Sequence, residues 1–313
     1  MTLWQRYLRP TSIQEAVEVL DQAHPNGRPI AGGTDLLIDL QQGRDTPPHT
    51  MVDISAIPEL AQIEQDEGYI FIGAGVTHRK IVHDPMLNDH GPALVKACGL
   101  IGGPQVRNVA TLGGNVAHAL PAGDGTIALL ALGAEAELTD REGRRWVLLE
   151  SLFSGPGQTT FDRSRQLLTR FRFRQRGPRE GSAFDRVMRP QGIAIAILNL
   201  SVWLQLDDRG QVTTARLALG PSGPTPRLSP SAEQALLGQS RNDHDFERVR
   251  DGLLADARLR TSRHRATKSY RKHLVGVLVE RAVPRAWDRA EAAPAETGGT
   301  PAPKGRQEPH AHG

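Results

Sequence analysis

Two short segments with adjacent glycines carry the residues best suited to bind a ligand. The first is Ala31-Gly32-Gly33-Thr34-Asp35-Leu36, and the second is Ala110-Thr111-Leu112-Gly113-Gly114-Asn115. Because glycine has no Cβ, successive backbone N–H groups at such a pair can turn toward one point and form a concave anion site. A plain glycine turn is the alternative for either pair taken alone. Two such segments in one chain suit a ligand with two phosphate groups, and therefore indicate a dinucleotide.

Neither segment matches a familiar nucleotide fingerprint. The chain lacks the glycine–lysine signature of a P-loop. Gly73-Ala74-Gly75 begins like the Rossmann pattern G-x-G-x-x-G, but His78 stands where the third glycine is required. The residues alone therefore predict two phosphate-binding turns and do not name the dinucleotide.

Taken together with other segments, the two glycine pairs resemble the FAD-binding subunit of molybdenum hydroxylases. That family includes the medium subunit of carbon monoxide dehydrogenase and the flavin part of xanthine dehydrogenase. The other segments that carry the resemblance are Gly73–Thr77, Gln105–Asn108, Asp124 and Arg260–Arg271. The likeness extends over most of the chain, from about residue 5 to about residue 285.

The resemblance implies an FAD site without a catalytic side chain or a metal ligand on this chain. The cofactor-binding residues that it implies are Ala31, Gly32, Gly33, Thr34, Asp35, Leu36, Gly75, Thr77, Ala110, Thr111, Gly113, Gly114, Asn115, Asp124, Leu168 and Arg186. At Arg186 the family often has lysine, so the charge is kept while its geometry changes. Gln166 stands where the family often has glutamate.

Two residues near the second segment have alternative roles. A related flavin fold attaches FAD covalently through histidine, but the resemblance favours non-covalent binding and a His118 that faces solvent or bonds to a loop. Asp124 either accepts hydrogen bonds from the ribose or adenine of FAD or caps the helix expected from about Gly125, and one role does not exclude the other.

Composition limits the class of protein. The chain has 313 residues, a net charge of +3 and few aromatic residues, so nothing indicates stacking on nucleic-acid bases. Cys98 is the single cysteine, which excludes an internal disulfide and an iron–sulfur cluster held by this chain alone. We expect a cytoplasmic protein, because neither a signal peptide nor a membrane span is evident.

The family resemblance also implies an α+β fold. The resemblance assigns residues 1–176 to an FAD-binding domain of the p-cresol methylhydroxylase and vanillyl-alcohol oxidase (PCMH/VAO) type with two α/β lobes. It assigns residues 177–288 to a domain like the C-terminal domain of the carbon monoxide dehydrogenase flavoprotein, a three-stranded antiparallel sheet with helices. Residues 289–313 contain almost no large apolar residues and are expected to be disordered.

Hydrophobic periodicity and capping signals place the individual elements. The expected helices are 13–23, 35–41, 79–82, 91–98, 127–132, 231–237, 246–254 and 270–282. The expected strands are 28–30, 51–54, 166–173, 183–188, 193–206 and 212–219. Two hairpins are also expected: Ile63 pairs with 69–72 around the turn Asp66–Gly68, and 134–139 is joined to 145–148 through Arg141–Gly143.

The family resemblance implies a function within a larger complex. A small partner subunit would carry two 2Fe-2S clusters, a large one would carry molybdopterin cytosine dinucleotide, and the whole would form a dimer of heterotrimers. Electrons would pass from the clusters through FAD to O2, NAD+ or a quinone, among which the sequence does not choose. The alternatives are a self-sufficient FAD-dependent oxidoreductase of the same fold and a non-catalytic scaffold subunit.

Overall fold

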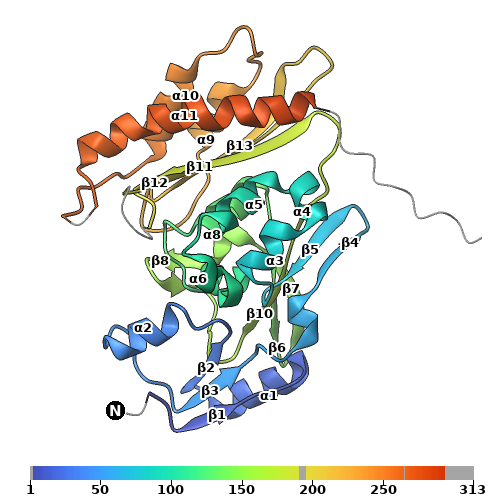
Figure 1. Cartoon of the computed structure of the whole chain (residues 1–313), viewed down its shortest axis with the longest axis vertical. Helices are drawn as coiled ribbons and strands as arrows, with labels where there is room; N and C mark the ends of the chain where they lie inside the picture. Colours follow the sequence, from blue (N-terminus) through green and yellow to red (C-terminus); the bar gives the residue numbers. More distant parts are fainter. Residues whose placement is uncertain (1–2, 190–194, 264, 293–313) are drawn as a thin grey trace, which may run out of the picture.

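The computed structural model describes residues 3–189, 195–263 and 265–292, and stacks them in three layers (Figure 1). A small parallel sheet forms the N-terminal layer, a five-stranded sheet with helices forms the middle layer, and a three-stranded sheet with a long helix forms the C-terminal layer. Each layer has its own buried apolar side chains. The predicted α+β class is confirmed. The disordered tail was predicted for 289–313, but residues 289–291 are helical, and residues from 293 onward lie outside the described residues.

The N-terminal layer has the strand order β1-β3-β2, and all its strands run parallel. Its elements are β1 (Arg6–Leu8), α1 (Ile13–Ala23), β2 (Gly27–Ile30), α2 (Leu36–Gln41) and β3 (Thr50–Asp53). Helix α1 begins as predicted, because Ser12 Oγ accepts a hydrogen bond from the Glu15 N–H at 3.1 Å. The Glu15 carboxylate accepts from the Thr11 N–H rather than from Ser12, so the capping box is displaced by one residue.

The middle layer is an antiparallel sheet of order β4-β5-β10-β6-β7. Its strands are β4 (Ile63–Asp66), β5 (Tyr69–Gly73), β6 (Glu135–Asp140), β7 (Gly143–Leu148) and β10 (Leu167–Arg174), with a separate hairpin of β8 (Phe153–Gly155) and β9 (Gln158–Thr159). Both predicted hairpins are present, but β10, expected as the last strand of its domain, occupies the centre of the sheet.

Six helices pack on one face of that sheet or beside it (Figure 1). They are α3 (His78–His83), α4 (Pro85–His90), α5 (Pro92–Gly99), α6 (Pro104–Val109), α7 (Leu112–Ala117) and α8 (Asp124–Ala131). Helices α4, α6 and α7 were not predicted from the sequence. Each has only six residues and therefore shows too little hydrophobic periodicity to be recognised.

The C-terminal layer is the predicted three-stranded antiparallel sheet with helices on one face. It contains β11 (Glu180–Val187), β12 (Leu198–Leu206), β13 (Val212–Gly220), α9 (Pro230–Leu236), α10 (Phe246–Asp256) and α11 (Lys268–Glu291). Strand β12 begins at Leu198, later than the predicted residue 193, and residues 190–194 lie outside the described residues. Helices α5 and α8 of the middle layer pack against this sheet.

Helix α11 continues well past its predicted end at Ala282. It includes Pro284, which costs a helix interior about 3 kcal/mol because it removes one backbone hydrogen bond. The helix continues because Val283, Ala286 and Trp287 remain almost fully buried against the sheet. Burying large side chains such as those of Val283 and Trp287 stabilises by at least about 1.5–3 kcal/mol each, which together offsets the cost of the proline.

Candidate functional site

A pocket of about 1490 Å³ opens where the three layers meet. Every cofactor-binding residue predicted from the sequence lines this pocket except Gly75 and Thr77. Pockets for single small ligands typically enclose about 300–1,000 Å³. The space is therefore large enough for an extended ligand such as a dinucleotide.

The first glycine segment has the properties expected of an anion site. Gly33 adopts φ +66°, the left-handed region that favours glycine. Within the part of the chain that the structure describes, no protein acceptor takes the backbone N–H groups of Gly32, Gly33, Thr34 and Asp35. Four consecutive free N–H groups with one left-handed residue make a concave donor surface for a phosphate.

The second glycine segment differs from the prediction, because it is the first turn of α7 rather than a glycine turn. Its N–H groups are already occupied: Leu112 donates to Val76 O at 3.0 Å, Gly113 to Ala74 O at 2.8 Å, and Gly114 to Thr111 Oγ1 at 3.0 Å. Thr111 therefore caps the helix through its hydroxyl oxygen, which accepts from the Gly114 N–H. The prediction of two equivalent phosphate turns is wrong on this point, and the free donors belong to the first segment.

The two glycines of the second segment instead allow neighbouring groups to come close to the backbone. A Cβ on Gly113 would lie 2.6 Å from both Cβ and O of Ala74, so glycine is needed there for packing. A Cβ on Gly114 would meet only Thr111 Oγ1, at 3.2 Å. Since Gly114 also lines the pocket, its missing side chain leaves room for the ligand.

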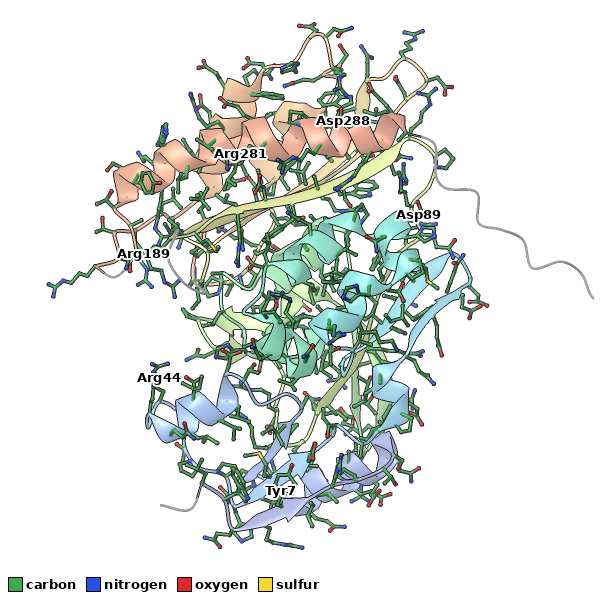
Figure 2. The ribbon with its side chains drawn as sticks, viewed as in Figure 1. Tyr7, Arg44, Asp89, Arg189, Arg281 and Asp288 are labelled. Carbon is green, nitrogen blue, oxygen red and sulfur yellow. The ribbon has the colours of Figure 1, made fainter. Side chains whose placement is uncertain are left out.

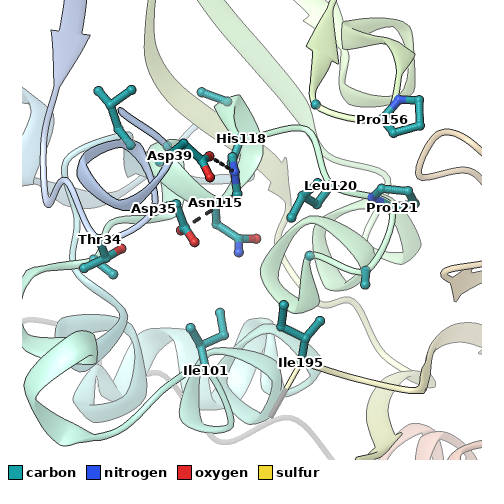
Figure 3. Close-up of a pocket in the computed structure, with 18 of the residues that line it drawn as sticks. Thr34, Asp35, Asp39, Ile101, Asn115, His118, Leu120, Pro121, Pro156 and Ile195 are labelled. Carbon is teal, nitrogen blue, oxygen red and sulfur yellow. Dashed lines mark hydrogen bonds and ion pairs between the residues drawn. The ribbon is translucent and has the colours of Figure 1, made fainter. Parts of the chain in front are cut away.

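Asn115 connects the second segment to the helix that follows. Its Oδ1 accepts hydrogen bonds from the backbone N–H and the hydroxyl of Thr126, each at 3.1 Å. Its amide Nδ2 has no acceptor among the described residues, and the side chain lies at the pocket (Figure 3). The amide group is thus fixed by its oxygen and can donate to a ligand through its nitrogen.

His118 ties the two glycine segments together (Figure 3). Its Nε2 lies 3.1 Å from Asp39 Oδ2, and its Nδ1 lies 3.8 Å from Asp35 Oδ2. Asp39 lies within helix α2, and Asp35 is the N-cap of the same helix. His118 is the C-cap of α7. The hydrogen-bond partner of His118 is thus a helical residue, Asp39, and the predicted bond to a loop is not what the structure shows.

Asp124 and Arg186 form a buried ion pair across the boundary between the middle and C-terminal layers. The guanidinium of Arg186 also donates to Leu100 O, and Asn199 Nδ2 donates to Asp124 Oδ1 at 2.6 Å. Burial raises the pKa of the Asp124 carboxyl, whereas Arg186 and Asn199 favour its charged form. Asp124 is the first residue of α8 and its side chain accepts no hydrogen bond from the helix N–H groups, so the predicted capping role is wrong; Asn115 bonds to the first turn of α8 instead.

Within the segment from Gly73 to Thr77, the predicted residues Gly75 and Thr77 do not line the pocket. Thr77 caps α3 by accepting from the Lys80 N–H at 3.2 Å, and the space beside Gly75 is filled by Leu60. The neighbours Ala74 and His78 reach the pocket in place of these two residues. His78 is 1% exposed, its Nδ1 has no partner among the described residues, and burial lowers its pKa to about 4.

Other chemistry is not indicated by the described residues. They contain no group of three or more histidine, cysteine, aspartate or glutamate side chains placed to hold a metal ion. Cys98 is buried, and burial raises the pKa of its thiol far above the usual range. Among the described helices, none is both long and apolar enough to cross a membrane.

Comparison with known proteins assigns the chain to a family. Residues 3–173 match the model of the FAD binding domain in molybdopterin dehydrogenase, and residues 182–286 match that of the CO dehydrogenase flavoprotein C-terminal domain. The chain belongs to this family of FAD-binding subunits. The match confirms the resemblance, the FAD cofactor and the oxidoreductase class predicted from the sequence.

Individual relatives align with this chain over almost their whole length. The chain is 31% identical over 283 residues to the putative xanthine dehydrogenase FAD-binding subunit of Escherichia coli, covering 90% of this chain and 95% of the relative. It is 30% identical to the carbon monoxide dehydrogenase medium chain of Afipia carboxidovorans, covering 91% and 97%. The solved carbon monoxide dehydrogenase of Hydrogenophaga pseudoflava superposes with a TM-score of 0.84 at 28% identity, covering 91% of this chain and 97% of that one.

Proposed function

We propose that this chain binds FAD non-covalently in the pocket and relays electrons from 2Fe-2S clusters on a small partner subunit to an external acceptor. A large partner subunit would hold molybdopterin cytosine dinucleotide and oxidise the substrate, and the complex would be a dimer of heterotrimers in the cytoplasm. The observation that carries the proposal is the set of four free N–H groups at Gly32–Asp35 in a pocket of dinucleotide size. Such a surface suits a pyrophosphate.

Each predicted residue then has a role in holding the cofactor. The free N–H groups of the first segment would bind phosphate oxygens, while Gly114 lets the ligand come close to the backbone. Asn115 would donate through Nδ2, and Leu168, which is 5% exposed, would give an apolar contact. Gly75 and Thr77 would act indirectly by supporting Ala74 and His78. When bound, FAD supplies the one- and two-electron chemistry, and the protein orients and tunes it.

The ion pair of Asp124 and Arg186 would hold the domains together beside the flavin. Both residues line the pocket, and Asp124 belongs to α8 while Arg186 belongs to β11. We place the domain boundary at residue 176, between the ends of the two family matches. One side of the pocket would thus be closed by the ion pair of Asp124 and Arg186, to which each domain contributes one residue.

The need for partners follows from the single cysteine. One thiol cannot hold an iron–sulfur cluster, so the clusters must lie on another chain. The carbon monoxide dehydrogenase medium chain and the nicotine 6-hydroxylase medium subunit are named as parts of larger enzymes. Nothing in the comparisons favours a self-sufficient oxidoreductase or a scaffold that has lost its flavin.

Anaerobic reduction of the isolated chain tests this proposal. Dithionite should bleach the flavin absorbance, whereas the organic substrate of the complex should not. Adding the iron–sulfur and molybdenum subunits should restore bleaching by that substrate. Rapid bleaching by substrate without the partners would refute the subunit role and support the self-sufficient oxidoreductase.

A further inference from the structure

The arginines that line the pocket fall into two groups. The first group lies outside the segment 258–271: Arg28 pairs with Asp45 at 2.6 Å, Arg44 with Asp39 at 3.1 Å and Arg186 with Asp124, while Arg163 donates to the carbonyls of Ala117 and Gly157. The second group comprises Arg258, Arg260, Arg265 and Arg271. Among the described residues, no carboxylate lies within 4.0 Å of any member of this second group.

The second group is concentrated on the C-terminal layer. Arg258, Arg260 and Arg265 lie in the segment between α10 and α11, and Arg271 is in the first turns of α11. Burial, and then the charges of Arg265 and Arg260, lower the pKa of Arg271. The like charges are therefore close enough to repel one another, and a bound anion would relieve that repulsion.

Arg271 has a buried nitrogen that lacks a hydrogen-bond acceptor among the described residues. It is only 4% exposed, and its Nη1 donates to Ile197 O at 2.8 Å. Its buried Nε has no partner among the described residues. Buried donors in proteins are nearly always bonded, so an unpartnered nitrogen beside a pocket indicates a missing acceptor.

The second group of arginines belongs to a different part of the fold from the free N–H groups described above. The free N–H groups of Gly32–Asp35 belong to the N-terminal layer, whereas these arginines belong to the C-terminal layer (Figure 1). One pocket can therefore hold two anionic groups at different places.

We propose that Arg258, Arg260, Arg265 and Arg271 form a second anion subsite, which takes the phosphate groups of a ligand other than FAD. Arginine is suited to this because its planar guanidinium binds phosphate through two parallel hydrogen bonds. Four guanidinium groups match a ligand with more than one phosphate, such as a nucleoside diphosphate. The inference rests on the proposed function, since it assumes that FAD fills the other part of the pocket.

Calorimetric titration of the FAD-loaded chain at low ionic strength tests the subsite, with pyrophosphate and ADP as the two probes. Both should bind without displacing FAD, and raising the salt concentration should weaken both. The double variant Arg260→Gln/Arg265→Gln should bind each probe roughly tenfold more weakly while its flavin content stays unchanged. Tighter binding of ADP than of pyrophosphate would assign the subsite to a nucleotide, and equal binding would assign it to phosphate groups alone.

The matched control is Arg263→Gln/Arg281→Gln, which removes the same charge outside the pocket. Arg263 shares the segment with Arg260 but does not line the pocket, and Arg281 lies on α11 (Figure 2). This control should bind both probes like the unmodified chain. If the double variant loses FAD, Arg260→Gln alone replaces it, because that side chain is exposed.

Three results would overturn the subsite. The FAD-loaded chain could fail to bind either probe, the Arg260→Gln/Arg265→Gln variant could bind them no more weakly than the control, or the probes could displace FAD. A chain that never retains FAD would instead overturn the proposed function. Flavin absorbance, recorded in every titration, separates these two failures.

Discussion

Asn115 Oδ1 accepts two hydrogen bonds from Thr126, one from the backbone N–H and one from the hydroxyl, each at 3.1 Å. A residue of the second glycine segment therefore fixes the first turn of α8, the helix that carries Asp124. The same amide keeps Nδ2 free at the pocket. One side chain thus combines a structural acceptor with a donor for the ligand.

Asn115→Asp separates these two functions. The carboxylate can still accept from Thr126, so we expect the melting temperature of the flavin-free chain to change little. The donor is lost and a negative charge is added beside phosphate groups, so FAD should bind at least roughly tenfold more weakly, or about 1.4 kcal/mol. Fluorescence titration with FAD measures this. Unchanged affinity would show that the Asn115 amide does not contact the cofactor.

Gly114→Ala tests the open face of α7. The new methyl group meets only Thr111 Oγ1 and otherwise enters the pocket, so FAD affinity should fall about tenfold or more while the fold persists. The control Gly276→Ala lies within α11 at ordinary contact distance from Arg250 and should leave affinity unchanged. Gly32→Ala should instead lower the melting temperature, because its Cβ would lie 2.1 Å from Val109 O. Normal flavin content in Gly114→Ala would contradict the assigned contact.

His78 should make the chain less stable in acid. Its pKa in the folded state is about 4, below the ordinary value of 6.5, because burial disfavours the charged ring. The unfolded chain therefore takes up a proton first as the pH falls from 6.5 to 4, and stability is lost over that range. The loss is about 3 kcal/mol. Urea unfolding from pH 7 to pH 4 should show His78→Leu losing less stability than the unmodified chain, and equal losses would refute the assignment.

Arg186→Gln should destabilise the junction of the middle and C-terminal layers. It leaves the Asp124 carboxylate buried without its charged partner, which typically costs about 3–5 kcal/mol. The double variant Asp124→Asn/Arg186→Gln removes the unpaired charge and should recover part of that loss. Unfolding free energies of the flavin-free chains at pH 7 give the comparison. A double variant less stable than Arg186→Gln would show that the two side chains act independently.

Local signals in the sequence were sufficient for much of the fold. Ser12 and the apolar spacing after it identified α1, and the turns at Asp66–Gly68 and Arg141–Gly143 identified two hairpins. The central position of β10 was not predictable, because strand order depends on pairings between distant residues. The full length of α11 was also missed, since burial of Trp287 and its neighbours outweighs the local signal of Pro284.

The candidate site shows the same division between local and long-range effects. The residue types at Gly32–Asp35 and at Gly114 indicated the pocket correctly, because glycine and free N–H groups act locally. The occupied N–H groups of α7 depend on carbonyls of Ala74 and Val76 far away in the chain. The partners of Asp124 likewise come from other elements, β11 and β12, so its capping role could not be rejected from sequence alone.

The most direct test of the central claim is the identity of the flavin. The purified chain should be yellow, and acid precipitation should release FAD into the supernatant, because the pocket offers donors for a pyrophosphate and no covalent attachment is expected. Chromatography of that supernatant distinguishes FAD from FMN. Recovery of FAD alone is the result predicted here, whereas FMN in the supernatant or flavin that stays with the precipitated protein would contradict it.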